Sequence, residues 1–490
     1  MNALFYGVNK RFRVCSLDQP FLLPPSLQDW LPEDHLARFI ADVANELDLS
    51  AIYAQYERHD GRGLSAYHPV LLTRLLLYGY CVGLTSSRRI ERATHDDVAF
   101  RYLAADQHPD HDTIANFRRE HLEVLAGLFV QALRLCQKAG LVKLGNVAID
   151  GTKIMANAST RRSVSYEKLM EREQYWKETV ERLLAEAQRT DEQEDQRWGK
   201  GQPADPLPVE LARAQSRLER LRQAKAELEQ EAQQRLETAR QNYTPRKRGR
   251  PNKEEAAARP SQDPEERKKA RNQFRRARRN AEEPTRQYNF VDPDSRVMKD
   301  NARKCFSQAY NAQVAADTHV QVIVAAEVTQ QTNDREQLLA MVESVRQTVG
   351  EAPQAVTADA GYWDTTSLSD PALVGIQVLV PPDSHPEPGD APLPSHAPQT
   401  DAAARMRETL ASENGRALYG LRKATVEPVF GQIKEARNIR RFRLRGLTRV
   451  AGEWKLICAT HNLLKLFRHR IGLAAETAQQ FASAEAPAFA

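Results

Sequence analysis

Apolar residues recur at helical spacing through the first 145 positions of the chain. Residues 36–47 and 68–84 have this period, and the second segment is apolar enough to lie in a core. Residues 86–103 form an amphipathic pattern, and a long helix is expected after a cap at Asp112 or Thr113, ending at Gly140. The pattern predicts an all-helical N-terminal domain over residues 1–145.

The polar positions of this helical region suit two interpretations. Short helices joined by a polar turn, with Arg118 and Arg119 near the start of the last one, are typical of a helix-turn-helix-like DNA contact. A plain helical bundle with a solvated basic face explains the same residues equally well. Both interpretations stay open at this stage.

After residue 145 the pattern changes to short apolar runs typical of strands. Helical periods return at 335–350 and from about 403 onward. The strand-like runs are 146–150, 310–317, 320–329, 354–359 and 376–383. Their order predicts an α/β domain with a mixed sheet and a large insertion after its first strand.

The predicted insertion is helical and then strongly basic. Residues 166–187 and 211–233 repeat apolar residues in a seven-residue seam, which favours an antiparallel helical hairpin. Residues 245–290 carry 15 Lys and Arg against 7 Asp and Glu, a local net of +8, and few apolar residues. This composition predicts a stretch that is disordered or only nascently helical when unbound.

These changes along the chain predict four parts. They are an N-terminal helical domain (1–145), a sheet domain (146–160 and 305–470), a helical-hairpin and basic insertion (161–304), and a flexible C-terminal tail (471–490).

The composition narrows the class of protein only slightly. The formal net charge of +5 is mild for 490 residues, and the five cysteines include no C-x-x-C pair. This cysteine usage argues against a zinc ribbon or a disulfide framework. No secretory signal or membrane-spanning run is found, so a cytoplasmic protein is expected.

Two strand-like runs lead into aspartates, at Asp150 in NVAID and at Asp359 in AVTAD. Each is followed by glycine within two residues, which permits a sharp turn. Sites in α/β sheets lie beyond the carboxyl ends of strands, and two neighbouring carboxylates repel unless a cation lies between them. Mg²⁺ prefers such hard oxygen ligands.

A third acidic residue, Glu427, stands directly before Pro428 on a predicted helix. Lys434 lies seven residues further on, nearly two turns, so both side chains share one face. An arginine-rich track follows, at positions 437, 440, 441, 443, 445 and 449. A carboxylate on this basic face favours a metal that faces a phosphate backbone over a merely solvated helix.

The quoted blocks resemble a known family. NVAIDGTKIMANAS, AVTADAGYWD and TVEPVFGQIK are similar to the three catalytic blocks of bacterial insertion-sequence DDE transposases, which have an RNase H-like catalytic domain. The resemblance extends to HPDHDTIANFRREH and WKLICATHNLLKL, so it covers most of the chain. The expected fold is therefore α/β, with an RNase H-like mixed sheet, an N-terminal all-helical domain and a helical-hairpin insertion after the first strand.

The resemblance implies roles for individual residues. Asp150, Asp359 and Glu427 become the catalytic and metal-binding triad, with two Mg²⁺ ions, or Mn²⁺ in their place. Tyr419, Arg422 and Lys434 match positions that contact DNA near the cleaved phosphate. Four residues separate Arg422 from Glu427 where the common pattern has three, so Lys423 is a further candidate for the arginine's role.

The implied partners are the element's terminal inverted repeats and target DNA, bound by a homodimer associated with the bacterial nucleoid. Within the basic stretch, Arg248 and Arg250 flank Gly249 in an AT-hook-like core, RGRP. Such a core inserts arginines into an A·T-rich minor groove. Generic phosphate contact by the same residues is the alternative.

The functional hypothesis is a Mg²⁺-dependent transposase that cleaves at the ends of an insertion sequence and transfers the strands to target DNA. One alternative is an RNase H-like nuclease without strand transfer. A second is a catalytically silent DNA-binding repressor or architectural protein, although a pure binder has no need of an intact Asp/Asp/Glu set.

Overall fold

A computed structural model describes residues 26–56, 66–198, 209–243, 264–300, 305–382 and 401–484. The chain divides into two compact units. The first comprises Met1–Leu141 and Leu456–Ala490, and the second comprises Val142–Lys455. This division assigns residues 456–470 to the N-terminal helices, whereas the sequence pattern assigns them to the catalytic domain. The predicted four-part domain organisation otherwise stays a prediction.

The first unit is helical in the part of the chain that is described, as the sequence predicts. Its most apolar helix, α3, begins with Pro69 after a His68 cap and buries nearly every side chain. Proline suits the first turn because its missing N–H would have no partner there. The helices are η1 Leu27–Trp30, α1 Leu36–Glu46, α2 Ser50–Tyr56, α3 Pro69–Cys81, α4 Ser87–Asp96, α5 Val98–Leu103, α6 His111–Glu120, α7 Leu122–Lys138 and the later part of α16 Leu447–Ala484.

Two predicted helices of this unit are each broken into a pair. Asp97 ends α4 and caps α5, accepting hydrogen bonds from the N–H groups of Ala99 and Phe100. Asp110, rather than Asp112 or Thr113, caps α6. The chain then breaks at His121, so the single long helix predicted up to Gly140 is wrong. Side-chain capping explains the break at Asp97 and the start of α6 at Asp110, because a short polar side chain offers the backbone an alternative partner.

Helix α16 also differs from its prediction. It extends through Ala484, whereas a flexible tail is predicted from residue 471. Within the first unit, the thiols of Cys81 and Cys136 lie 3.8 and 3.6 Å from the carbonyl oxygens of Thr460 and Asn462 on this helix. No described cysteine forms a disulfide. None of the described helices is long and apolar enough to cross a lipid bilayer.

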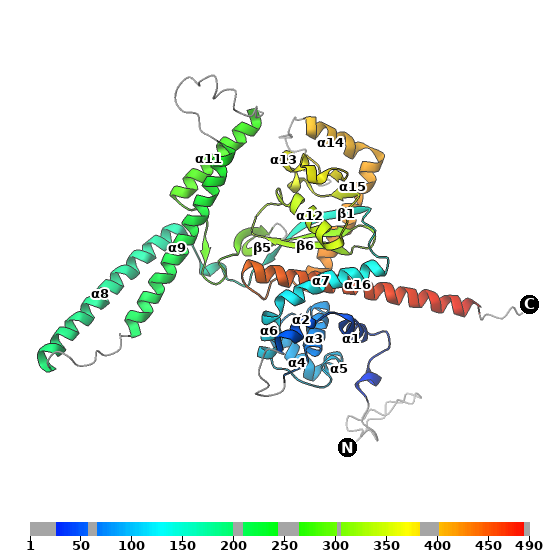
Figure 1. Ribbon diagram of the computed structural model, residues 1–490, viewed down its shortest axis with the longest axis horizontal. Helices are drawn as coiled ribbons and strands as arrows, with labels where there is room; N and C mark the ends of the chain where they lie inside the picture. Colours follow the sequence, from blue (N-terminus) through cyan, green and yellow to red (C-terminus); the bar gives the residue numbers. More distant parts are fainter. Residues whose placement is uncertain are drawn as a thin grey trace, which may run out of the picture. The chain divides into compact units, whose positions relative to one another are not determined.

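The second unit contains a mixed sheet with the strand order β4-β5-β1-β7-β8, and β6 also pairs with β5 (Figure 1). Strand β5 is antiparallel to β1, β4 and β6, whereas β1, β7 and β8 are parallel. The strands are β1 Asn146–Met155, β4 Arg296–Asp300, β5 Cys305–Asp317, β6 Ile323–Thr329, β7 Ala355–Thr357 and β8 Gln377–Leu379. Strands β5 and β6 are consecutive and antiparallel, so they form a hairpin from the predicted strand-like runs 310–317 and 320–329.

Helices cover both faces of this sheet. Asn146 of β1 donates a hydrogen bond to the carbonyl of Leu418 in α15 (Glu413–Gly431), so α15 lies on the face that carries the even-numbered side chains of β1. Helix α12 (Gln337–Val349) contacts the opposite face, where its Ser344 donates to Glu327 of β6. Gly350, with φ of 91°, ends α12 as the sequence predicts.

Short elements connect the sheet to its helices. They are η2 Thr160–Arg162, η3 Ala360–Tyr362, α13 Thr365–Leu368, η4 Pro371–Leu373, α14 Asp401–Ala411 and the π-helical turn η5 Gln432–Ala436. A separate two-stranded sheet pairs β2 (Ser163–Val164) with β3 (Tyr288–Asn289).

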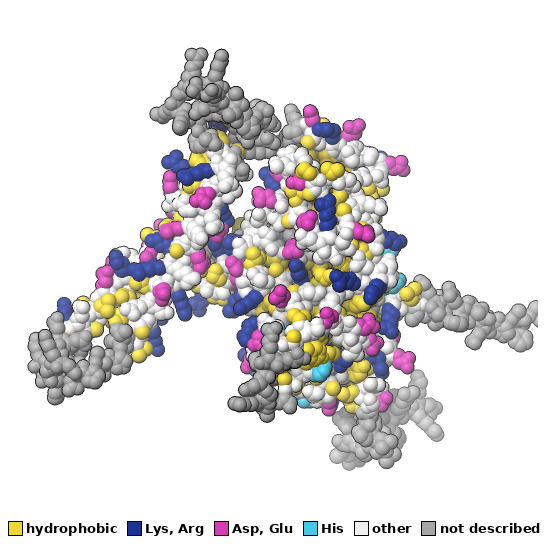
Figure 2. Space-filling model, in the orientation of Figure 1, with side chains coloured by type: hydrophobic (Ala, Val, Ile, Leu, Met, Phe, Trp, Pro, Cys, Tyr) yellow, Lys and Arg dark blue, Asp and Glu magenta, His cyan; other side chains and the backbone are white. Residues whose placement is uncertain are grey.

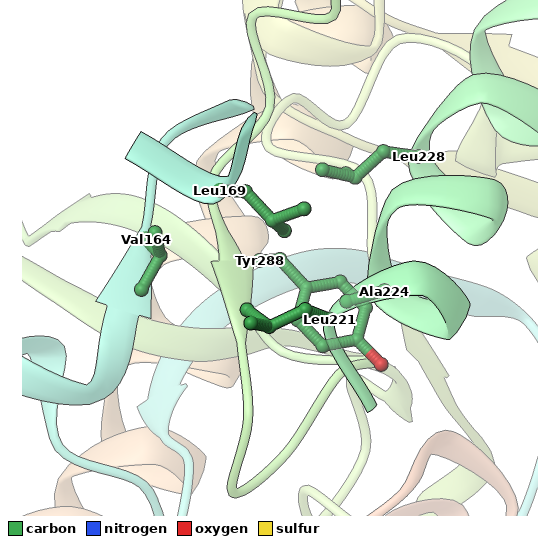
Figure 3. Packing of buried hydrophobic residues seen from close by; sticks show 6 residues of the cluster. All are labelled: Val164, Leu169, Leu221, Ala224, Leu228 and Tyr288. Carbon is green, nitrogen blue, oxygen red and sulfur yellow. The ribbon is translucent and has the colours of Figure 1, made fainter. Parts of the chain in front are cut away.

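Two long helices, α8 (Tyr166–Trp198) and α9 (Val209–Asn242), pack along each other (Figure 1). Leu169 near the start of α8 packs with Leu228 of α9, whereas Val180 further along packs with Leu211 and Leu218. The order of these contacts reverses along α9, so the pair is antiparallel. Figure 3 shows the first cluster, in which Val164 and Tyr288 of β2 and β3 meet Leu169 and the α9 leucines.

The basic stretch contains a helix in its described part. Residues Pro264–Glu282 form α11, which packs against α9 and places Phe274 beside Tyr243. Of the two predicted states, disordered or nascently helical, these residues have the helical one. Contact with α9 supplies the tertiary support that an isolated polar helix lacks.

Candidate active site

Asp150 lies in the middle of β1 and not at its end. The strand continues through Gly151 and Thr152 to Met155, and Asp150 pairs in register with Val314 of β5. The expectation that the strand closes on this carboxylate is therefore wrong. Pairing with the long strand β5 extends β1 beyond the apolar run, because backbone hydrogen bonds do not depend on side-chain polarity.

Asp359 reaches the same region from the neighbouring strand. Strand β7 ends at Thr357, which pairs in parallel with Ala148 of β1. Asp150 lies two residues after Ala148, and Asp359 lies two residues after Thr357. The Asp359 side chain caps η3 by accepting a hydrogen bond of 2.9 Å from the N–H of Gly361. Parallel pairing thus brings the two predicted aspartates together at one position of the sheet.

The electrostatics of the two carboxylates reflect this proximity. Burial, and then the charge of Asp359, raise the pKa of Asp150 to about 7. Burial also raises the pKa of Asp359, while Arg422 acts in the opposite direction. Two carboxylates that resist ionisation beside each other form a site that favours a cation.

Helix α15 supplies cationic and aromatic side chains to the same place. The Arg422 guanidinium donates a hydrogen bond of 3.3 Å to the Asp150 carboxylate, and its charge lies over the Tyr419 ring at 5.8 Å. Burial raises the pKa of Tyr419. Beyond Pro428 the helix passes into the η5 turn, where Lys434 donates a hydrogen bond of 3.0 Å to Thr152. Thr152 lies two residues from Asp150 on the same face of β1.

Glu427 lies on the same helix between Arg422 and Lys434 in sequence. Its side chain is 63% exposed and forms an ion pair of 4.0 Å with Lys423. Within the described ranges, no three His, Cys, Asp or Glu residues are grouped closely enough to hold a metal ion. The structure therefore brings Asp150, Asp359 and Arg422 together and leaves Glu427 outside a closed ligand set.

A polar network that the sequence argument missed lies on the other face of β1. The Asp334 carboxylate accepts hydrogen bonds of 2.6 Å from both Asn311 and Gln313 of β5, and Lys153 lies 3.7 Å from it. The Tyr362 hydroxyl donates to Gln313, which connects the network to the turn after Asp359. Asp334 also raises the pKa of Asp150 and of Asp359.

Gly151 permits this network to lie against the backbone of β1. A Cβ atom on Gly151 would lie 2.2 Å from Gln313 Nε2 and 2.8 Å from Asp334 Oδ1. The sequence contains one signal for the network: Asn311 and Gln313 place polar side chains at alternate positions of an otherwise apolar strand. Such buried polar groups need partners.

The aromatic residues after Asp359 pack in the core. Tyr362 is fully buried and Trp363 is nearly so. Their burial is that of core residues and leaves little ring surface for stacking on a base.

The predicted DNA-binding arginines of the first unit differ in their surroundings. Arg118 is buried, and its guanidinium donates hydrogen bonds to the Tyr80 hydroxyl and the Thr85 carbonyl at 3.1 and 2.8 Å. This position gives Arg118 a structural role and does not support a direct DNA contact. Arg119 is exposed beside Glu120. Arg248 and Arg250 lie outside the described residues.

Comparison with protein families gives two matches. Residues 25–120 match the family described as "Transposase domain (DUF772)", and residues 393–467 match the "Transposase DDE domain". Both descriptions are of transposases, so the class of protein that the chain represents is a transposase. The second match includes Tyr419, Arg422, Glu427 and Lys434, so two separate parts of the chain are similar to transposase domains, and these matches support an insertion-sequence DDE transposase. Searches of curated proteins and of solved structures found no match.

Proposed function

We propose that this transposase cleaves DNA at the ends of its element and transfers the freed strands to target DNA, with Asp150, Asp359 and Glu427 as its catalytic carboxylates. The observation that carries the proposal is the pairing of β1 with β7, which places Asp150 and Asp359 within electrostatic reach of each other. A shared site of two partly buried carboxylates has a clear use in phosphoryl transfer and no evident use in a protein that only binds DNA.

The carboxylate oxygens of Asp150 and Asp359 fit a divalent cation such as Mg²⁺ or Mn²⁺ in donor type and charge. Two such ions, held by these residues and by Glu427, would neutralise the scissile phosphate and activate the attacking oxygen. The proposal requires the Glu427 side chain to leave Lys423 and turn toward the aspartates. Both residues are exposed, and an exposed ion pair stabilises its geometry only weakly.

The basic side chains of α15 and η5 would orient the DNA. Arg422 lies beside Asp150, where a guanidinium can bind a phosphate oxygen while the carboxylates face the reacting phosphorus. The Tyr419 ring stabilises the position of the Arg422 guanidinium through the cation–π contact. Lys434, on Thr152, would hold a second phosphate of the same strand, and Lys423 a further one.

We further propose an RNase H-like catalytic domain that contains the α8–α9 pair and α11 as an insertion after β1. The support is the mixed sheet, antiparallel on the β5 side of β1 and parallel on the β7 side, with helices on both faces. The first unit, through Arg119, and the basic stretch, through Arg248 and Arg250, would add DNA contacts. Two element ends must be held together, so a homodimer is proposed on DNA.

The decisive experiment incubates the purified protein with labelled element-end DNA, a target plasmid and Mg²⁺. Asp150→Asn keeps the shape of the side chain and removes its charge. Asp317→Asn is the matched control, because Asp317 is a buried carboxylate of the same sheet that accepts hydrogen bonds from the N–H groups of Lys143 and Leu144.

Joined products from the wild type and from Asp317→Asn, absent with Asp150→Asn, support the proposed transposition. Cleavage without joining would instead support a nuclease. Binding by the wild type without cleavage would contradict both enzymatic activities.

A further inference from the structure

A basic groove lies further along the sheet, beyond the candidate active site. Its cavity measures about 520 Å³. The groove is formed by the end of β1, the start of β5, the segment around η2 and the segment that follows η5. Its charged and aromatic lining residues are Arg162, Arg441, Arg445 and Phe306.

The charge of this groove has one sign. None of the described residues that line it is acidic, and none of its three arginine side chains forms an ion pair within the described ranges. Arg445 is held in place by a hydrogen bond of 2.9 Å from its Nε to the carbonyl of Asn157. A polyanion is therefore the ligand that the groove fits by charge.

The aromatic residue of the groove is unusually exposed. The side chain of Phe306 is 67% accessible, the largest value among the exposed aromatic residues of the described ranges. An exposed phenylalanine among arginines is poorly explained by packing. It matches the combination found in single-stranded nucleic-acid sites, where bases stack on aromatic rings and cations follow the backbone.

The groove also lies on the same face of the sheet as the catalytic carboxylates. On β5, the side chains of Val314, Tyr310 and Phe306 lie on one face of the sheet, because they are four residues apart. Val314 pairs with Asp150. Arg441 forms a bridge with Met155, the last residue of β1. Five residues of strand separate Asp150 from Met155, which is roughly 16 Å, a distance that an unpaired strand spans with a few nucleotides.

We propose that this groove binds an unpaired segment of the DNA strand that leaves the active site, with one base stacked on Phe306 and phosphates on Arg441, Arg445 and Arg162. The inference rests on the proposed function, because it is the catalytic carboxylates that place the reacting strand on this face. It adds a binding site beyond the basic residues that flank Glu427.

The test uses four variants of the full chain. Phe306→Ala removes the ring, and Phe306→Tyr keeps a stacking surface. Arg441→Gln removes one cation. Tyr175→Ala is the matched control, because Tyr175 is a comparably exposed aromatic residue of α8 in the same unit. Binding to a short mixed-sequence single strand and to its duplex is measured by fluorescence anisotropy over a range of salt, with a chelator present to prevent cleavage.

The expected results separate the two ligands. Phe306→Ala weakens single-strand binding about tenfold, which corresponds to the loss of one stacked base, and weakens duplex binding much less. Phe306→Tyr and Tyr175→Ala bind like the wild type. Arg441→Gln lowers the slope of log affinity against log salt by about 0.7 for the single strand.

The inference is overturned if Phe306→Ala binds the single strand as tightly as the wild type does. It is also overturned if the variant loses the same factor of affinity for the duplex as for the single strand. A 2-aminopurine placed along the element-end strand gives a second reading, since quenching should peak a few nucleotides from the cut and vanish with Phe306→Ala. Because binding is measured without metal, a protein that binds as predicted but never cleaves refutes the proposed function and leaves the groove intact. Cleavage by the wild type with unchanged binding of Phe306→Ala refutes the groove alone.

Discussion

At the scale of single residues, the charge of Asp150 is the most consequential feature of the candidate site. The Asp150 side chain lies largely inside the protein beside Asp359, and the charge of Arg422 and the hydrogen bond from the Gly151 N–H only partly oppose the effects of burial and repulsion on its pKa. The metal-free protein therefore carries an electrostatic cost where a bound cation would provide compensation. Such a cost has a direct signature in the pH dependence of stability.

We predict that Asp150→Asn stabilises the metal-free protein above neutral pH. The folded-state pKa of about 7 lies above the unfolded value of about 3.9, so folding favours the protonated form. Wild-type stability should fall as pH rises from about 4 to about 7 and then level off. The advantage of the variant should reach on the order of a few kcal/mol. Urea unfolding in chelator at several pH values measures this difference, and a difference independent of pH would contradict the assignment.

Arg118 leads to a second prediction at this scale. Arg118→Gln should lower the free energy of unfolding by about 1–3 kcal/mol, because the Tyr80 hydroxyl and the Thr85 carbonyl lose a buried charged donor. DNA affinity per folded molecule should stay unchanged. Arg119→Gln, at an exposed position, should leave the free energy of unfolding nearly unchanged and should lower DNA affinity. Chemical denaturation and DNA titration of both variants distinguish the structural from the DNA-binding role.

At the scale of elements, the pairing of β1 with β5 decides where the polar network can lie. Gly151 and Gln313 are paired in register, and the glycine leaves room for the amide of Gln313 and the carboxylate of Asp334. The network thereby connects the strand of Asp150, the strand β5 and the turn after Asp359. We expect it to fix the spacing of the two carboxylates from behind the sheet.

We predict that Gly151→Ala destabilises the protein by about 1–3 kcal/mol through overpacking. The same substitution in a Gln313→Ala background should cost less, with a coupling energy of at least about 0.5 kcal/mol, because the nearest clashing atom is then absent. Gly420→Ala is the control, since nothing lies within 4 Å of a Cβ at that helical position. Strict additivity of the two substitutions would show that the contact is not formed.

Helix α11 has the composition of a DNA-contacting element. Its 19 residues include eight Lys and Arg against three Glu, a net of +5, whereas α8 carries six against ten, a net of −4. In Figure 2, Lys and Arg side chains are visible over α11. The five exposed arginines of α11 are Arg271, Arg275, Arg276, Arg278 and Arg279.

We predict that replacing these five arginines by glutamine flattens the salt dependence of DNA binding by roughly 1–4 in the log–log slope, since each lost phosphate contact removes about 0.9. A matched control replaces five exposed basic residues of α8: Lys168, Arg172, Lys177, Arg182 and Arg189. The α8 set should leave the slope nearly unchanged, because acidic neighbours already offset its charge. Equal effects of both sets would assign the binding to net charge and not to α11.

At the scale of the whole molecule, each chain offers one candidate set of catalytic carboxylates, whereas an insertion sequence has two ends. A chain of 55.4 kDa with a single site can process both ends together only as an assembly. The proposed homodimer is inferred from this requirement alone, and no contact within the single chain contributes to the inference.

We predict that the protein bound to paired-end DNA has the mass of two chains and two end duplexes, measured by light scattering or native mass spectrometry. Asp150→Asn should assemble in the same way, because the substitution removes catalysis and retains the DNA-binding surfaces. A single chain that binds and joins both ends by itself would contradict the dimer.

The sequence by itself determined the helical N-terminal region, the order of β1, β5, β6, β7 and β8 in the sheet domain, without β4, and the helical pair α8–α9. Hydrophobic periodicity specifies these elements locally, and the transposase motifs stand in contiguous blocks. It did not determine the breaks at Asp97 and His121, the length of β1 or the helix α11. Capping, strand pairing and helix packing decide such features through neighbours that periodicity does not contain.

Only the tertiary structure decided which distant residues meet. Strand pairing brought Asp150 to Asp359, and packing of α15 brought Arg422 to Asp150. Pairing also placed Asp334 and Gln313 behind Gly151 and Phe306 among the arginines of the groove. Each contact joins residues far apart in sequence, and the free energy that selects it comes from burial and pairing of the whole sheet. The sequence of one strand supplies a carboxylate. The charge state and the partners of that carboxylate depend on the strands and helices around it.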